Sequence, residues 1–278
     1  MLILSLVLAF LPSIIWLGLF LREDVHPEPR RLIVRVFVAG MLITIPTIAL
    51  EAVLNCAILG CPAQMAENST MFSFSSPLLM LPEAVRRVLY IFFGIALVEE
   101  VFKYVAVRYS IMRSPHFDEP VDALLYLIVA ALGFAAVENA FTVSNAGIQA
   151  AGLFRPGGVM VILGARSLSA TLLHTLTSGI LGYGLARSFF SRLHRRTFLF
   201  VGIVVATMVH GTYNGLVGGV LTNENTATAV VSTVVLLILT GTVLLLMLRN
   251  VRSLSENRKW RNTGKGAEEI HLIKPSQT

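Results

Sequence analysis

Seven apolar stretches, each about 20 residues long or longer, constrain the fold of this chain more than any other feature. A helix of about 20 residues spans the ~30 Å hydrocarbon core of a bilayer. We therefore expect an all-α, polytopic transmembrane helical bundle with spans at 2–21, 32–59, 88–108, 121–143, 159–185, 197–221 and 226–248. Only 14% of the 278 residues are charged, whereas soluble domains carry about 25%. This composition excludes a cytosolic enzyme, a secreted disulfide-rich module and a disordered regulator.

The distribution of lysine and arginine between the loops predicts the orientation of the bundle. The loops after the first, third and fifth spans are rich in arginine, whereas residues 60–80 and 222–225 contain no lysine or arginine. Basic loops stay in the cytoplasm, so we expect the N-terminus outside and the C-terminus inside. Residues 1–248 then form the transmembrane bundle, and residues 249–278 form a basic, polar and flexible cytoplasmic tail.

Two features of the predicted outer side do not follow from this pattern. Arg86 and Arg87 precede the third span where basic residues are disfavoured, so we expect residues 78–88 to form a short helix in the outer interface. Cys56 and Cys61 are too few for a metal-binding knuckle. We interpret them as small apolar residues near a helix end, and a disulfide requires that this end face an oxidising compartment.

The formal net charge of +6 does not indicate binding to nucleic acid. Seven of the 22 lysines and arginines follow the last span, and most of the others lie in short loops. Basic residues beside spans set topology and contact anionic lipid. The lipid bilayer is therefore the expected partner of these charges.

Ionisable side chains inside the predicted spans are the strongest indication of function. A charged residue near the middle of a transmembrane helix costs about 2.5–3.5 kcal/mol on insertion scales, so such residues face a protein interior or water. Counting ~1.5 Å per residue along each helix, these side chains occupy overlapping depths and can converge. They are Glu99, Glu100, Lys103, Glu138, His174 and His210. Glu51 and Arg166 lie nearer to helix ends and are weaker candidates.

Helical geometry separates the roles that these residues can have. Glu99 and Lys103 are four residues apart and share a helix face. Glu100 is rotated by about 100° from Glu99, so the two carboxylates cannot do the same work. His210 and Asn214 are also four residues apart and present an imidazole and an amide on one face.

Two imidazoles and a carboxylate from separate helices suit a divalent metal such as zinc, whose bound water has a pKa near 7. We expect Glu138, His174 and His210 as ligands and Glu99 or Glu100 as the general base. Asn214 or Lys103 can polarise a substrate carbonyl. Two alternatives remain open: a proton- or ion-coupled transporter that uses the cluster as a relay, and a non-catalytic scaffold.

The motifs that contain these residues resemble the PrsW family of intramembrane proteases, which is related to the CAAX-processing and Abi-type membrane proteases. They are Glu-Glu-Val-Phe-Lys at 99–103, Gly-Phe-Ala-Ala-Val-Glu-Asn at 133–139, Leu-Leu-His-Thr around His174, and His-Gly-Thr-Tyr-Asn at 210–214. Pro-Glu-Pro at 27–29 is similar too. Lys103 stands one position before the arginine of the CAAX-type pattern, and Glu138 stands where that pattern has histidine.

The resemblance implies a metalloprotease of the bacterial cell membrane. It implies hydrolysis of a peptide bond near the membrane surface, in a membrane-anchored protein such as an anti-sigma factor. It also implies that Glu99, the first glutamate of the pair, activates water, which leaves Glu100 as the partner of Lys103.

Overall fold

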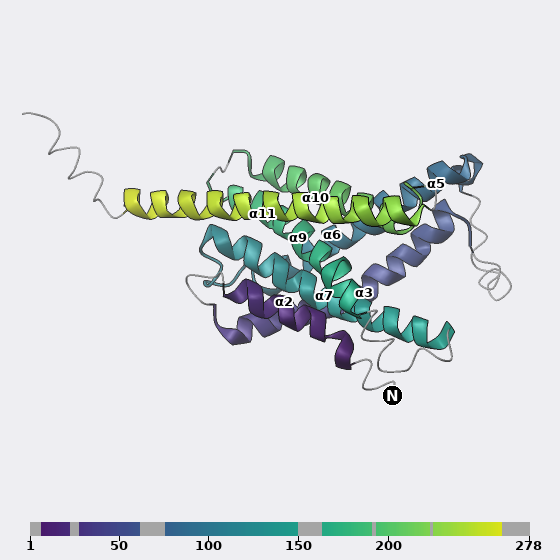
Figure 1. The fold of residues 1–278 in the computed structure, drawn as a ribbon. Helices are drawn as coiled ribbons and strands as arrows, with labels where there is room; N and C mark the ends of the chain where they lie inside the picture. Colours follow the sequence, from purple (N-terminus) through teal and green to yellow (C-terminus); the bar gives the residue numbers. More distant parts are fainter. Residues whose placement is uncertain are drawn as a thin grey trace, which may run out of the picture.

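A computed structural model describes residues 7–22, 28–61, 76–149, 163–190, 193–222 and 225–262. These residues form helices and loops and contain no strand, which confirms the all-α prediction. The helices are α2 (Leu11–Leu21), α3 (Arg30–Ile58), η1 (Pro77–Met80), α5 (Glu83–Leu89), η2 (Tyr90–Ala96), α6 (Leu97–Ser110), α7 (Pro120–Gln149), α9 (Ala170–Arg187), α10 (Arg195–Val217) and α11 (Thr226–Asn262). Figure 1 shows them as one bundle.

Each predicted span coincides with a helical segment, but the segments differ in character. Four helices are long and apolar enough to cross a membrane by length and composition: α3, α7, α10 and α11. The third span carries two glutamates and a lysine, and α9 mixes leucine with hydroxyl, glycine and histidine residues. These two less apolar segments are the ones that carry most of the predicted site.

Helix α7 lies in the centre of the bundle, between α3 and α9. Its residues from Asp122 to Ala136 are buried, and many of them are alanine or glycine. A Cβ atom on Gly40 of α3 would collide with the backbone carbonyl of Ala130, and one on Gly133 would collide with that of Phe37. Small residues let transmembrane helices approach backbone to backbone, so this pair of glycines holds α3 against α7.

The third span is one continuous helical path from Glu83 to Ser110, formed by α5, η2 and α6. The expectation of a separate interfacial helix at 78–88 is therefore wrong, because α5 continues through a π-helical segment into α6. Arg86 instead closes the end of α3, since its Nη1 donates to the Leu59 carbonyl at 2.8 Å. A cation at a helix C-terminus is favourable, which gives Arg86 a structural role at the end of α3.

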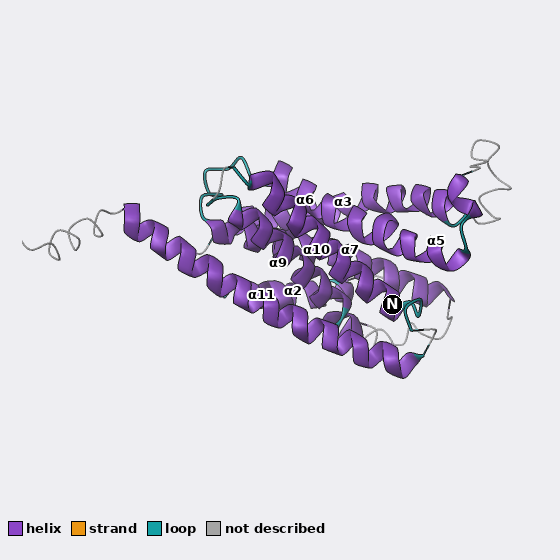
Figure 2. Cartoon of the chain, turned by 90° about the horizontal axis from the view of Figure 1, so that it is seen from above, coloured by secondary structure: helices purple, strands orange, loops and turns teal. Residues whose placement is uncertain are grey.

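Helix α11 extends past residue 248, where the last span was expected to end, to Asn262. Figures 1 and 2 show its C-terminal turns projecting beyond the other helices, at the end of the bundle opposite to α5. The first part of the predicted tail is therefore helical. Residues 263–278 lie outside the described residues, and the division of the chain into bundle and tail stays a prediction.

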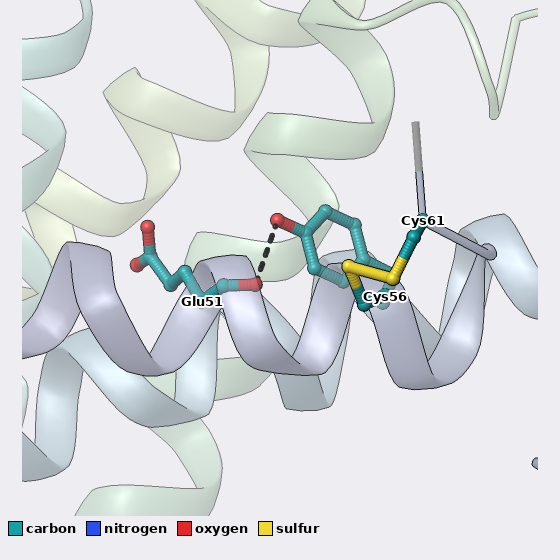
Figure 3. The surroundings of a disulfide bond; sticks show 4 residues. Glu51, Cys56 and Cys61 are labelled. Carbon is teal, nitrogen blue, oxygen red and sulfur yellow. Dashed lines mark hydrogen bonds between the residues drawn. A yellow bond between two sulfur atoms is a disulfide. The ribbon is translucent and has the colours of Figure 1, made fainter. Parts of the chain in front are cut away.

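At the other end of the bundle, a disulfide joins Cys56 in the last turns of α3 to Cys61 (Figure 3). This pairing corrects the interpretation of both cysteines as small apolar residues. Disulfides persist in oxidising compartments, so the bond agrees with the predicted outer position of this end. Tyr90 ties the start of η2 to the same helix, because its hydroxyl donates to the Glu51 carbonyl at 3.5 Å.

Candidate metal centre

Four helices bring the ionisable residues of the predicted spans into one cluster. Helix α6 supplies Glu99, Glu100 and Lys103, and α7, α9 and α10 supply Glu138, His174 and His210 respectively. The described side chains of Glu99, Glu100, Lys103, His174 and His210 are at most 5% exposed. Asn214 lies one turn beyond His210 on α10 and faces the same cavity.

Glu100 is held inside the bundle by four contacts. Its Oε1 accepts hydrogen bonds from Lys103 Nζ and from Thr177 Oγ1, both at 2.9 Å. The same oxygen lies 2.8 Å from His210 Nδ1, and Oε2 accepts a hydrogen bond from Ser178 Oγ at 3.3 Å. Glu100 is fully buried and is not among the residues that line the cavity, so its carboxylate orients neighbours.

Glu99 has the opposite environment, as the rotation between adjacent residues requires. Its Oε2 lies 3.6 Å from His174 Nδ1, 3.8 Å from His210 Nε2 and 3.3 Å from Lys103 Nζ. This oxygen is buried and accepts no hydrogen bond from the described residues. Glu99 also lines the cavity. The first glutamate of the pair therefore faces the space beside both imidazoles.

One oxygen of Glu99 and one nitrogen each of His174 and His210 lie within 4.8 Å of one another. In a tetrahedral zinc site with bonds of 2.0–2.1 Å, neighbouring donor atoms are about 3.3–3.4 Å apart. The distances from Glu99 Oε2 to His174 Nδ1 and His210 Nε2, 3.6 and 3.8 Å, are only a few tenths of an ångström longer. These nitrogen and oxygen donors fit a borderline divalent ion such as zinc.

Both imidazoles are also oriented by a second carboxylate. Glu100 contacts Nδ1 of His210, and Oε2 of Glu138 lies 2.6 Å from Nε2 of His174. Carboxylates in such positions fix the ring and the tautomer of a metal-binding histidine. Glu138, which the sequence suggested as a ligand, thus contacts the ring edge of His174 opposite to Glu99. Its role as a ligand stays a prediction, and the geometry offers Glu99 instead.

Lys103 restricts how an ion can bind. Its Nζ lies 2.9 Å from His174 Nδ1 and is also held by Glu100, and it sits 4.8 Å from the centroid of the Phe134 ring. An ion at Nδ1 of His174 would have to take the place of the contact with Lys103, whose Nζ would keep its ion pairs with Glu99 and Glu100.

Sequence reasoning gave little weight to the polar neighbours of Glu138. Arg166 pairs with Glu138 at 3.3 Å, and its Nε donates to Oδ1 of Asn139. Asn139 in turn donates to Thr171 Oγ1 on α9 at 3.2 Å. Asn139 could have been predicted as a site residue, because it directly follows Glu138 in the motif at 133–139.

The cluster forms one wall of a cavity of about 530 Å³. The cavity reaches Leu59, Arg87 and Val220, at the ends of α3, α5 and α10, and its wall includes Ile91, Ile95 and Leu173. Glu51 and Tyr213 also line it. Tyr213 was missed, because one tyrosine in an apolar helix gives no signal of function. Glu99, His174 and His210 thus line a cavity that extends to these helix ends.

The sequence matches the PrsW family of intramembrane metalloproteases over residues 28–242. Proteins named Protease PrsW from Geobacillus kaustophilus, Oceanobacillus iheyensis and Bacillus subtilis are 26%, 27% and 25% identical to it. These matches cover 71%, 75% and 73% of this chain and 72%, 80% and 78% of the relatives. No solved structure is significantly similar to the chain. The apolar helices and these relatives indicate a multi-pass protein of a bacterial membrane, and the chain belongs to the PrsW family of intramembrane metalloproteases.

Proposed function

We propose that this protein is a metal-dependent peptidase that cleaves a membrane-anchored regulator, similar to an anti-sigma factor, near the outer membrane surface. One observation carries the proposal: the buried donors Glu99, His174 and His210 form the wall of a cavity of about 530 Å³ that reaches the helix ends. Such a cavity admits an extended peptide and shields the reacting bond from bulk water. The family resemblance supplies the class of substrate.

Glu99, His174 and His210 would hold the ion, and zinc suits this donor set. When bound, the ion supplies Lewis-acid chemistry, which polarises the peptide carbonyl and acidifies water. Glu100 and Glu138 keep the two imidazole rings in place from their other nitrogens.

Glu138 is the carboxylate best placed to move the proton. Its side chain is 32% exposed and lines the cavity, whereas that of Glu99 is 5% exposed. In hydrolysis, the water oxygen bonds to the carbonyl carbon, Glu138 takes the proton and passes it to the leaving amine, and the C–N bond breaks. Asn214, on the same wall, donates its amide N–H to the developing oxyanion. The roles expected for Glu99 and Glu138 are thus exchanged.

The experiment compares Glu99→Gln and Glu138→Gln in purified, vesicle-reconstituted protein, with metal content and cleavage of a doubly tagged single-pass anti-sigma factor as readouts. Glu99→Gln should lose both the ion and activity. Glu138→Gln should weaken metal binding by about 10- to 100-fold, as for an outer-shell partner, but still bind the ion at saturating metal and then lose about 10²–10⁴-fold in turnover, the usual contribution of a general base. If the two variants behave in the opposite way, the exchange of roles is wrong.

His210→Ala and His116→Ala test the site itself, because His116 is exposed in the loop between α6 and α7. We expect His210→Ala to abolish cleavage and metal binding and His116→Ala to keep both. A wild-type protein that cleaves the substrate without any bound divalent ion would reject metal dependence. A transporter that uses a proton relay would carry no stoichiometric ion and would leave the substrate intact.

A further inference from the structure

Glu51 is the one cavity carboxylate that the proposed chemistry does not use. It lies on α3, seven residues before the helix ends at Ile58, which is about 10 Å along the axis. Its Oε1 is buried and accepts no hydrogen bond from the residues that the structure describes. In Figure 3 the dashed hydrogen bond reaches the backbone carbonyl of Glu51, and the carboxylate stands clear of the helix.

The other charged groups of the cavity wall have partners of opposite charge. Arg87 pairs with Glu83 at 2.6 Å, Arg166 with Glu138 at 3.3 Å, and Glu99 with Lys103 at 3.3 Å. Within the described part of the chain, no lysine or arginine nitrogen lies within 4.0 Å of the Glu51 carboxylate. Buried charges in proteins are normally paired. Glu51 is therefore the carboxyl group of this cavity wall that has no cationic side chain beside it.

Apolar and aromatic side chains line the same cavity as Glu51, among them Leu59, Tyr90 and Ile91. Lysine and arginine side chains combine an aliphatic stem, which packs along apolar surface, with a charged head that forms charge-assisted hydrogen bonds. A carboxyl group beside apolar surface therefore suits such a side chain better than an acidic or purely apolar one.

A second metal ion is a poorer match. Among the described residues, the group of ionisable side chains with metal-ligand geometry consists of Glu99, His174 and His210, and Glu51 does not belong to it. A lone carboxylate supplies one ligand, whereas a resident divalent ion takes several from the protein.

We propose that Glu51 is a substrate-binding subsite that receives a lysine or arginine side chain close to the scissile bond. This subsite selects membrane-anchored substrates that carry a basic residue at the matching position, and it rests on the proposed peptidase function. Glu51 is a specificity-determining residue, since it contacts the substrate side chain away from the reacting atoms.

The first test measures cleavage of a single-pass protein whose cut site has been found with the wild-type enzyme. Lysine, norleucine and glutamate are placed in turn at each of the four positions on either side of the cut. At one position, lysine should raise kcat/KM over norleucine by about 10- to 100-fold, the range of a desolvated charge pair. Glu51→Gln should abolish that preference and leave the norleucine substrate unchanged, and Glu51→Lys should reverse it towards glutamate.

Asp118→Asn is the matched control, because Asp118 is an exposed carboxylate in the loop between α6 and α7. It should retain the wild-type preference. Equal effects of Glu51→Gln on the lysine and norleucine substrates, or no effect on either, would overturn the subsite. Failure of the wild-type protein to cleave any substrate, or an active His210→Ala variant, contradicts the peptidase function instead.

The second test needs no turnover. Nα-acetyl-lysine amide should raise the melting temperature of the detergent-solubilised protein more than Nα-acetyl-norleucine amide does, because a ligand that binds the folded state stabilises it. Glu51→Gln should remove this difference between the two ligands, and Asp118→Asn should keep it. Equal shifts with both ligands in the wild-type protein would refute a subsite for a basic side chain.

Discussion

Replacement of Glu100 by glutamine tests whether this carboxylate organises the cluster. The change keeps the shape of the side chain but removes the negative charge that lies 2.9 Å from Lys103 Nζ. The new amide can accept hydrogen bonds on its one oxygen only. The two oxygens of Glu100 contact four side chains: Lys103, Thr177, Ser178 and His210. Breaking a buried ion pair by removing one partner costs about 3–5 kcal/mol.

Lys103 retains Glu99 at 3.3 Å after this change, so we place the loss in the free energy of unfolding at the lower end, about 3 kcal/mol. Loss of the contact to His210 Nδ1 should also weaken metal binding by about 10- to 100-fold, the usual effect of an outer-shell partner. Both quantities follow from the same four contacts.

Denaturant unfolding in mixed micelles and metal titration measure these effects. Glu83→Gln is the matched control, because Glu83 forms an exposed pair with Arg87 and such pairs contribute about 0–1 kcal/mol. If Glu100→Gln unfolds within about 0.5 kcal/mol of the wild type, the usual range for surface changes, the reasoning about this buried carboxylate fails.

Three further predictions concern the ion, the packing and the topology. A chelator should stop cleavage by the wild-type protein and zinc should restore it, whereas a metal-independent peptidase would stay active. Gly133→Ala should destabilise the bundle by about 1–3 kcal/mol through overpacking, because the new Cβ atom would collide with the Phe37 carbonyl. Gly18→Ala is the control, since a Cβ atom there meets nothing within 4 Å. Equal unfolding curves for the two variants would contradict this prediction. Single cysteines at Thr70 and Asn223 should react with a membrane-impermeant thiol reagent added outside the cell, and those at Ser191 and Ser255 only with reagent inside. These positions lie outside the described residues or side chains. A cytoplasmic Thr70 would reverse the predicted orientation.

The helices could be predicted because length and hydropathy are properties of the chain itself. Their ends were harder, since packing decides where a helix stops. Helix α11 continues past 248 into a polar sequence that has no proline or glycine before Gly264 to break it. The third span begins as early as Glu83, where Arg86 contacts the Leu59 carbonyl, a contact between residues far apart in sequence.

Within the site, relations along one helix could be predicted and relations between helices could not. The 100° step separates Glu99 from Glu100, and in the structure both are buried but only Glu99 lines the cavity. An imidazole, however, offers two nitrogens on opposite edges, and sequence does not tell which edge meets which carboxylate. Glu138 at Nε2 and Glu99 near Nδ1 of His174 are both consistent with the same motifs.

The orientation of Glu51 likewise could not be predicted from the sequence, and this orientation bears on substrate specificity. Its position near a helix end made it a weak candidate, because a carboxylate there can reach the membrane surface. Depth along α3 does not show which way the side chain faces, and the structure turns it into the cavity, with one oxygen buried and without a hydrogen bond. A carboxyl group kept there without a cationic partner among the described residues is available to pair with a basic group that enters the cavity. The catalytic donors come from α6, α9 and α10, so a residue on α3 can vary the preferred substrate without altering the group that holds the ion.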